Sequence, residues 1–291
     1  MLSLNIIGAG KVGRTLARLW TQNGVFAVQD LLTAHAASAD AAVEFIGAGH
    51  AAGSIPEMRT AAVWLLTLPA SRIAECCEGL AASGLLRAGD IVFHCSGSQS
   101  ANELAVAARA GAHVASVHPL KSFTDSAQAV QTFAGTWCGA EGDGAALAVL
   151  KPAFEAIGAR LFDIDPGSKL IYHAASVLVC NYLAALFETG ARCYEKAGLE
   201  RETALKVMEP LVRETLDNIF RIGTAGALTG PIARGDHAVV KRQLEALAAW
   251  DPRIAAIYRQ LGAVTVELAR EQGKADADLL AAIERALSGD K

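Results

Sequence analysis

The amino-acid sequence predicts a doubly wound α/β domain with a mostly parallel sheet, followed by an all-α C-terminal domain. In residues 1–165, short runs rich in β-forming residues alternate with helical patterns, as expected for parallel strands joined by crossover helices. From residue 166 onward, apolar residues recur at helical spacing only. The 291 residues also exceed the usual size of one hydrophobic core, so we expect one domain at 1–165 and a second at 166–291.

Eight segments of the first domain have the pattern of strands. Apolar runs such as AAVWLLTL and DIVFHC are nearly continuous, which is typical of strands buried on both faces of a parallel sheet. The predicted strands are Leu2–Ile7, Val25–Thr33, Val43–Ile46, Ala62–Leu68, Ile91–Cys95, His113–Val117, Thr136–Gly139 and Arg160–Ile164. Helical patterns separate several of them, at Arg14–Gln22, Arg72–Ser83 and Ala101–Ala110.

The second domain has clear helix start and stop signals. Asp165-Pro166 is a typical helix start, with Asp at the N-cap and Pro in the first turn, and Gly198 is a typical C-terminal cap. Asp236 and Asp251 are two more candidate N-caps. The predicted helices cover residues 166–197, 201–222 with a bend at Pro210, 237–249, 252–272 and 276–287.

Composition and charge exclude several classes of function. A net charge of -4 gives no electrostatic reason to expect nucleic acid or an acidic membrane as a partner. Consecutive apolar residues never reach the ~18 needed for a membrane span, and the N-terminus does not have the pattern of a signal peptide, so we expect a cytoplasmic protein. The six cysteines form no CxxC pair and are expected to be reduced, and no metal site is predicted.

The first strand is followed directly by a GxGxxG motif, formed by Gly8, Ala9, Gly10, Lys11, Val12 and Gly13. In a Rossmann domain the first glycine permits a tight turn, the second lets a pyrophosphate approach the backbone, and the third lets helix and strand pack closely. A glycine-rich turn without a ligand is the alternative. Because the motif lies between a strand and a helix in an alternating α/β region, we predict dinucleotide binding.

The end of the second strand decides which dinucleotide fits. An NAD site has an acidic residue at this tip. Asp30 is a candidate, but the apolar Leu31 and Leu32 indicate that the strand continues to Thr33. In that register the tip carries Thr33 and His35, which suit a 2′-phosphate better than a carboxylate does, although no arginine follows to hold it. NADP is therefore favoured as the cofactor, with NAD as the alternative.

The first helix of the second domain has a polar face. Lys169, Tyr172, His173 and Ser176 lie on one side of a helix at 100° per residue. A lysine and a histidine one turn apart could supply a proton donor and a group that polarises a carbonyl. The alternative is a solvated lysine beside a histidine that is bonded to a neighbouring loop.

Six motifs occur in order along the chain: GAGKVG, LLTLP at 65–69, HCSG at 94–97, HPLKSF at 118–123, KLIYHAA at 169–175 and LTGPIARGD at 228–236. Together they resemble a bacterial family of predicted short-subunit dehydrogenases, in which a Rossmann domain precedes a helical domain of unassigned role. The wider relatives are phosphogluconate-dehydrogenase-like oxidoreductases, including hydroxyisobutyrate dehydrogenases, ketopantoate reductases and pyrroline-carboxylate reductases. The resemblance extends over almost the whole chain.

The resemblance implies roles for individual residues. Lys169 matches a lysine that is catalytic in several relatives, whereas His173 stands where those relatives have asparagine, so their detailed mechanism does not transfer directly. Leu68, Pro69 and Ser96 are implied to lie beside the cofactor, with Ser96 also near the substrate. His118 is implied to donate a hydrogen bond to substrate, or only to order the HPLKSF loop. Lys121 and Ser122 are weaker candidates, and Ala34 and His35 stand where a basic residue is common, which disfavours NADP.

The LTGPIARGD segment interrupts the helices of the second domain. Its glycines and proline are compatible with a simple connector, in which Asp236 only caps the next helix. The alternative is that Gly230 brings a rigid backbone close to a ligand, while Arg234 holds a carboxylate or phosphate in a bidentate grip. We expect this loop to close over the cofactor cleft, with Thr229, Gly230 and Arg234 binding substrate.

These observations predict an NAD(P)-dependent oxidoreductase that reduces a small-molecule substrate, either a 2-oxo acid similar to ketopantoate or an imine, with hydride from NADPH. The alternative is a non-catalytic dinucleotide-binding sensor or scaffold. A deazaflavin partner, as used by related NADP reductases, stays open. The wide apolar faces of residues 170–195 and 254–269 predict a homodimer through the helical domain, while a simple interdomain core is the alternative reading.

Overall fold

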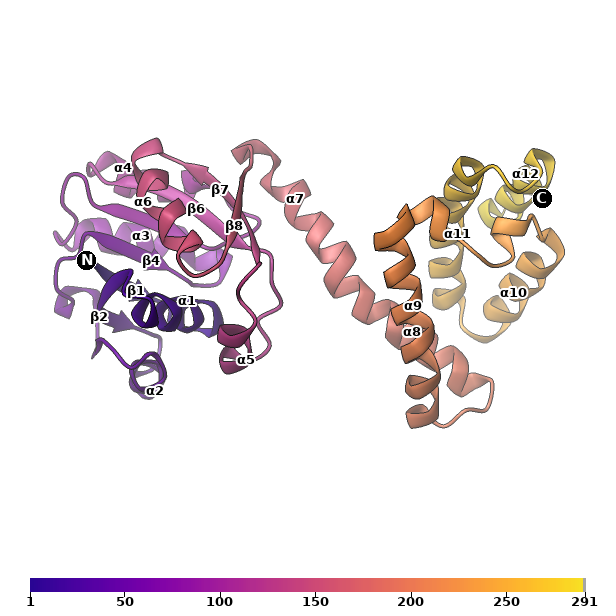
Figure 1. The fold of residues 1–291 in the computed structure, drawn as a ribbon, viewed down its shortest axis with the longest axis horizontal. Coiled ribbons are helices and arrows are strands. Elements are labelled where there is room, and N and C mark those ends of the chain that lie inside the picture. The colour runs from indigo at the N-terminus through magenta and orange to yellow at the C-terminus, as the bar shows by residue number, and fades with distance from the viewer. Residues whose placement is uncertain (290–291) are drawn as a thin grey trace. The chain divides into compact units, whose positions relative to one another are not determined.

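A computed structural model describes residues 1–289, and contacts within the chain group them into two compact units (Figure 1). The first unit is Met1–Tyr182, and the second begins at Leu183. Regular structure after residue 165 is entirely helical among the described residues. The first helical segment after residue 165 nevertheless groups with the sheet, because its Lys169 side chain is buried there.

The first unit is built on one eight-stranded sheet, with strand order β3-β2-β1-β4-β5-β6-β7-β8. All neighbouring strands are parallel except β6 and β7, which are antiparallel. This confirms the predicted doubly wound, mostly parallel sheet. The strands are β1 (Leu2–Ile7), β2 (Phe26–Leu32), β3 (His50–Ala52), β4 (Val63–Leu66), β5 (Ile91–His94), β6 (His113–Pro119), β7 (Trp137–Gly142) and β8 (Arg160–Asp163).

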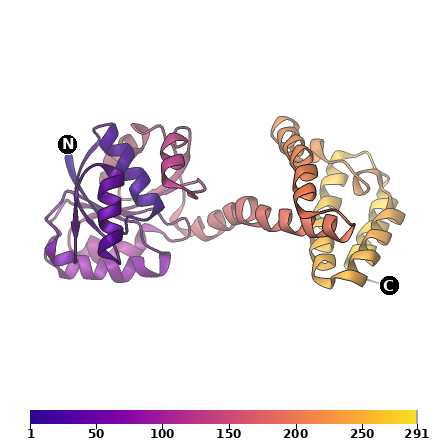
Figure 2. The same ribbon diagram turned by 90° about the horizontal axis from the view of Figure 1, so that it is seen from below.

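Helices cover both faces of this sheet (Figures 1 and 2). One hydrophobic core lies under α1 (Lys11–Gln22), α2 (Ala36–Ile46) and α6 (Gly144–Glu155), with α5 (Ser126–Gln131) packed beside α1. Its centre is Trp20, whose Nε1 donates to the Ala153 carbonyl at 2.9 Å. The second core lies under α3 (Ile73–Ala82) and α4 (Ala105–Arg109).

The predicted strand Val43–Ile46 is wrong, because these residues form the last turn of α2. Apolar residues at helical spacing, including Ala39, Ala42 and Ile46, are the buried face of this helix, and Gly47 ends it in the left-handed conformation at φ +76°. The third strand is the short β3 instead. Helices α5 and α6 were also absent from the predicted helices.

The helices after residue 165 match the prediction closely, which confirms the all-α C-terminal region. They are η4 (Pro166–Ser168), α7 (Lys169–Ser176), a π-helical turn (Val177–Asn181), α8 (Tyr182–Lys196), α9 (Arg201–Ala227), η6 (Ile232–Arg234), α10 (His237–Trp250), α11 (Pro252–Gln272) and α12 (Ala277–Ser288). The carboxylates of Asp236 and Asp251 cap α10 and α11 as predicted. Helical φ/ψ values continue through Pro210 and are interrupted at Gly223 instead of there.

The helical stretch Pro166–Lys196 is 31 residues long and apolar enough, by length and composition, to cross a membrane. The chain has no run of ~18 consecutive apolar residues, as expected, but this stretch is apolar enough on average. Counting consecutive apolar residues missed it, because polar residues such as His173 and Asn181 interrupt the apolar ones. One such helix is weak evidence for membrane insertion.

Candidate active site

The glycine motif forms the tight turn between β1 and α1. Gly8 has φ +92°, and a Cβ atom placed there would lie 2.7 Å from the Thr67 carbonyl oxygen. A Cβ on Gly13 would lie 3.0 Å from the Gly8 carbonyl oxygen and would overlap the Thr67 hydroxyl. A Cβ on Gly10 would meet no atom within 4 Å. The first and third glycines are therefore required by packing within the protein, whereas the second leaves open space above the turn.

Two side chains that sequence reasoning did not select hold this turn in place. The Thr67 hydroxyl, at the end of β4, donates a hydrogen bond to the Gly8 carbonyl. Arg14 donates from two guanidinium nitrogens to the Ala9 carbonyl, each at 3.2 Å. Thr67 stands inside the LLTLP motif, so its position after a buried strand was the available signal. Lys11 is exposed on the first turn of α1.

Two cavities lie at the carboxyl ends of the strands, beside the turn. The smaller one, about 140 Å³, is lined by Val12, Leu68 and Ser96 among others. The larger one, about 530 Å³, is lined by Thr33, Leu68 and Pro69 among others. Ligands in open α/β sheets bind at this edge. The predicted cofactor residues Thr33, Leu68, Pro69 and Ser96 therefore border cavities, while His35 does not line either one.

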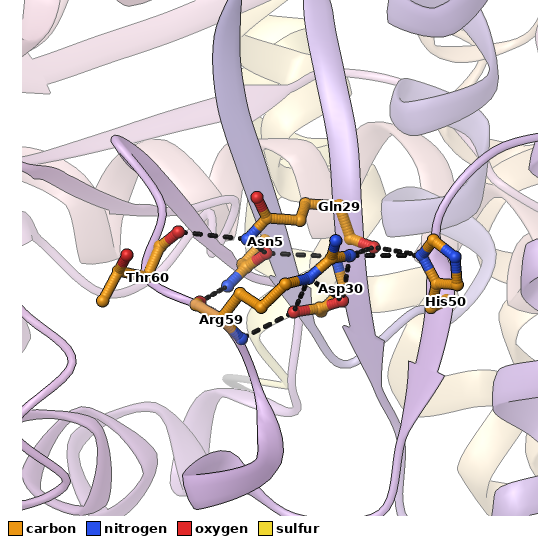
Figure 3. A network of polar contacts seen from close by, with 6 residues as sticks. All are labelled: Asn5, Gln29, Asp30, His50, Arg59 and Thr60. Atoms are coloured by element: carbon orange, nitrogen blue, oxygen red, sulfur yellow. Dashed lines mark hydrogen bonds and ion pairs between the residues drawn. The ribbon is translucent and has the colours of Figure 1, made fainter.

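Asp30 is not free to bind a ribose (Figure 3). Its carboxylate accepts from the Arg59 backbone amide and from the Arg59 guanidinium, both at 2.6 Å, and its side chain is 7% exposed. Burial alone would raise the pKa of Asp30, but the Arg59 hydrogen bonds and charge outweigh it and hold that pKa below the ordinary value. His50 and Asn5 complete the network. Strand β2 runs past Asp30 to Leu32, as the register argument predicted.

Lys169 is buried, with a side chain that is 1% exposed. Its ammonium donates to the Ser96 carbonyl at 3.0 Å and to the Ser116 hydroxyl, and it lies 3.7 Å from the Glu141 carboxylate. Burial lowers the pKa of Lys169, although the charge of Glu141 acts to raise it. Burial likewise raises the pKa of Glu141, whose carboxylate also accepts from the Ala101 amide at 2.8 Å. The lysine thus connects α7 to the segment that follows β5 and to strands β6 and β7.

Glu141 and Ser116 were missed by sequence reasoning. Ser116 on β6 and Glu141 on β7 are register partners in this antiparallel pair. A carboxylate in the otherwise apolar strand WCGAEG was the only local signal, and nothing in the sequence indicates that β7 runs antiparallel to β6.

His118, Tyr172 and His173 form a cluster beside this lysine. The His118 Nδ1 and the Tyr172 hydroxyl are 2.8 Å apart, and the imidazole centroids of His118 and His173 are 6.0 Å apart. A Cβ on Gly97 would lie 2.8 Å from His118 Nε2 and would overlap the His173 ring. Gly97 therefore allows both imidazoles to approach the backbone that follows Ser96, which lines the smaller cavity.

The protonation states in this cluster follow from burial. Burial, together with the nearby positive charge of Lys169, lowers the pKa of His118 to about 4, so its imidazole is neutral at physiological pH. Burial raises the pKa of Tyr172 to about 12, so its phenol keeps its proton. One hydrogen bond joins His118 Nδ1 and the Tyr172 hydroxyl, and in the tautomer in which the phenol donates, the single ring proton of neutral His118 lies on Nε2, which faces Gly97.

The weaker candidates of the HPLKSF loop are placed elsewhere. The Lys121 ammonium donates to the Thr132 carbonyl at 2.8 Å and to its hydroxyl at 2.9 Å, so it fastens this loop to the end of α5. Ser122 is exposed.

The LTGPIARGD segment lies in the second unit, between α9 and α10. Gly230 has φ +93°, and the Gln272 side chain of α11 donates to the Leu228 carbonyl at 2.9 Å, which fixes the start of the loop. Thr229 and Arg234 are exposed. Among residues 1–289, no hydrogen-bond or ion-pair partner of the Arg234 side chain is found. A hydrogen bond thus fixes the backbone at the start of this loop, while the Arg234 guanidinium is unpaired among the described residues.

Comparisons with known protein families divide the chain in the same order. Residues 1–119 match the model of a Rossmann-like domain, and residues 136–265 match that of a domain of unknown function (DUF2520). No curated protein matches the chain.

Several solved structures share the fold. A protein from Thermotoga maritima is 25% identical with a TM-score of 0.74, over 93% of this chain and 99% of its own. A candidate NADP oxidoreductase from Bacteroides fragilis is 23% identical with a TM-score of 0.72, over 93% and 97%. An imine reductase from Myxococcus stipitatus, solved with NADP+, is 15% identical with a TM-score of 0.64, over 96% and 98%. The chain thus joins a Rossmann-like domain to a domain of unknown function (DUF2520).

Proposed function

We propose that this protein is an NADP-dependent oxidoreductase that reduces a small oxo acid or imine. The observation that carries the proposal is the open space above Gly10, at a turn where Gly8 and Gly13 are packed against the protein. The NADP oxidoreductase and imine reductase names of proteins with this fold support the same cofactor and reaction class.

The residues of the first unit fit such a cofactor. The turn from Gly8 to Gly13 would hold the pyrophosphate at the start of α1, and Thr33 would border the adenosine ribose in the larger cavity. Leu68 lines both cavities. Ser96 lines the smaller one and is followed by Gly97, which His118 approaches. When bound, the reduced nicotinamide would supply a hydride to the substrate carbon.

The His118–Tyr172 pair is suited to supply the matching proton. The substrate oxygen or nitrogen takes the proton from His118 Nε2, and Nδ1 takes the phenol proton from Tyr172, so the imidazole stays neutral. The phenolate of Tyr172 then regains a proton from solvent after the product leaves. His173, whose ring approaches Gly97 as that of His118 does, would contact the same substrate.

Lys169 is better suited to positioning than to touching substrate. Its ammonium is enclosed by the Ser96 carbonyl, the Ser116 hydroxyl and the Glu141 carboxylate. It holds the backbone just before Gly97, and its positive charge adds to the effect of burial in lowering the pKa of His118. This differs from the role that the resemblance implies, in which the lysine itself is catalytic.

The first experiment is a fluorescence titration of the purified protein with NADPH and NADH in parallel, followed by a panel of 2-oxo acids and cyclic imines screened for NADPH oxidation. In a turnover assay, His118→Asn should leave NADPH binding unchanged and lower kcat by about 100-fold or more. Ser122→Ala, a change at an exposed residue of the same loop, is the control and should retain activity. NADPH binding without turnover of any substrate would favour the sensor reading, and no binding would refute the proposal.

The part of the proposal that concerns the second unit is the role of Thr229, Gly230 and Arg234 in substrate binding. Arg234 is an exposed guanidinium that could hold a substrate carboxylate. Once a substrate is found, Arg234→Ala should raise its KM far more than it weakens NADPH binding, and equal effects would contradict this role.

A further inference from the structure

We propose that Arg72 binds the 2′-phosphate of the dinucleotide and that Glu75 sets how strongly it does so. The sequence places no arginine after the second strand, where a 2′-phosphate is usually held, and the structure supplies one from a different element. This inference rests on the proposed function, because it concerns the same dinucleotide.

Arg72 lines the larger cavity together with the end of β2. It is the last residue of the 3-10 turn Ala70–Arg72 that follows β4 and leads into α3, whereas Thr33 follows β2. Both side chains border the same cavity of about 530 Å³, although they are far apart in the sequence. The cavity therefore joins the strand tip, where a ribose is expected in this fold, to a guanidinium that no sequence motif marks.

The charges around this cavity favour a phosphate over a ribose hydroxyl. Among the described residues that line it, Arg72 is the only cation and Glu75 the only carboxylate. Asp30, the carboxylate that an NAD site would use, is occupied by Arg59. The first turn of α2, next along the chain from Thr33, holds no acidic residue that would repel a phosphate.

The guanidinium of Arg72 is available to a ligand. Its Nε lies 2.7 Å from the Glu75 carboxylate, but the two side chains are 63% and 67% exposed, and ion pairs this exposed contribute little. One terminal nitrogen makes a long hydrogen bond of 3.4 Å to the same carboxylate, and for the other no partner is found among residues 1–289. A 2′-phosphate can thus take two guanidinium donors while Glu75 gives way.

Glu75 acts in the opposite sense to Arg72. Its carboxylate neutralises the guanidinium when the cavity holds no phosphate, and it would repel a phosphate dianion that enters. The alternative role for Glu75 is to accept a hydrogen bond from the 2′-hydroxyl of NADH, in which case removing its charge would weaken NADH binding. These two roles predict opposite effects of removing its charge, so the pair can be tested directly.

The test measures Kd values for NADPH, NADH, adenosine 2′,5′-bisphosphate and adenosine 5′-monophosphate on the wild type and on three variants. Arg72→Ala should weaken NADPH and the bisphosphate by about ten-fold or more, because a charge-assisted pair is lost, and should leave NADH and the monophosphate unchanged. Arg72→Lys should restore part of the loss. Glu75→Gln should strengthen NADPH binding and leave NADH unchanged.

Arg87→Ala is the matched control, since Arg87 is an exposed arginine that lines neither cavity. Thermal unfolding of each variant checks that the fold is retained. Equal loss of NADPH and NADH in Arg72→Ala would overturn the inference, as would a loss of NADH binding alone in Glu75→Gln. If the wild type binds no dinucleotide, the proposed function fails instead, and if it binds both equally, only the 2′-phosphate site fails.

Discussion

At the scale of single residues, the buried pair of Lys169 and Glu141 is the most demanding feature of the candidate site. Two charges removed from water are tolerated only when their remaining hydrogen-bonding capacity is used. Here the Ser96 carbonyl and the Ser116 hydroxyl accept from the lysine, and the Ala101 amide donates to the glutamate. The pair therefore holds together β6, β7 and the segment after β5 beside the site, at a cost in desolvation.

Removing one partner of this pair should be strongly destabilising. Glu141→Ala leaves the Lys169 ammonium buried without its counter-charge and the Ala101 amide without its acceptor, so we expect a loss of about 3 kcal/mol in the free energy of unfolding. Glu141→Gln keeps an oxygen that can accept from the Ala101 amide, so its loss in the free energy of unfolding should be smaller. Urea denaturation measures both, with the exposed Asp163→Ala, which removes the partner of Lys151, as a control that should change little. Equal effects of all three variants would contradict this account.

The Asp30–Arg59 pair should contribute a pH-dependent part of the stability. Because the folded pKa of Asp30 is held below its ordinary value of 3.8, the contribution is present above that value and is lost as the pH falls through the folded pKa. Asp30→Asn should therefore be less stable than the wild type at neutral pH, and the difference should shrink as the pH falls below 3.8. Denaturation across this range, with the exposed Asp40→Asn as control, measures it, and a constant difference would refute it.

At the scale of elements, long helices with periodic apolar residues were predicted well, whereas a short helix and the antiparallel direction of one strand were not. The helix at 252–272 was predicted to the residue, because its Asp251 cap, its proline and its terminal Gly273 mark both ends. The short α2 was partly mistaken for a strand, since its last residues VEFI suit either structure. The antiparallel direction of β7 leaves no trace in its composition.

The same division holds for the candidate site. The glycine turn and the strand tip at Thr33 could be predicted because their signals are local. The hydrogen bond between His118 and Tyr172 joins residues that are 54 positions apart in the sequence. The hydrogen bond between Ser116 and Lys169 joins residues that are 53 positions apart. Such pairs follow from the order of strands in the sheet, so their chemistry becomes visible only once β6, β7 and α7 are placed together.

The glycine turn makes a prediction that separates folding from binding. Gly10 has φ -72°, which alanine adopts freely, and a Cβ there meets no protein atom, so Gly10→Ala should leave thermal stability unchanged. It should nevertheless abolish most NADPH binding, because the Cβ fills the space that the pyrophosphate needs. Gly13→Ala, whose Cβ overlaps the Thr67 hydroxyl, should lower stability as well. If Gly10→Ala binds NADPH as the wild type does, the turn is not the phosphate site.

At the scale of the whole molecule, the helical stretch Pro166–Lys196 exposes a large amount of apolar surface. Exposed fractions of 73% for Leu170, 74% for Ile171, 60% for Leu178 and 74% for Val179 are high for side chains of this size in water. We propose that a second copy of the chain covers this surface. The alternatives are a simple interdomain core, a membrane, for which the length and composition of the helix are weak evidence, and a different protein.

Introducing charge on this surface tests which of these covers it. Sedimentation velocity of the wild type should show a dimer, and Leu178→Glu with Val179→Glu should shift it to monomer, because two carboxylates would have to lose water in the interface. Leu279→Glu, on an exposed leucine of α12, is the control and should stay dimeric. A wild type that is monomeric at every concentration and sediments with added lipid vesicles would support the membrane instead. A wild type that is monomeric and does not bind vesicles would leave an interdomain core or a different protein.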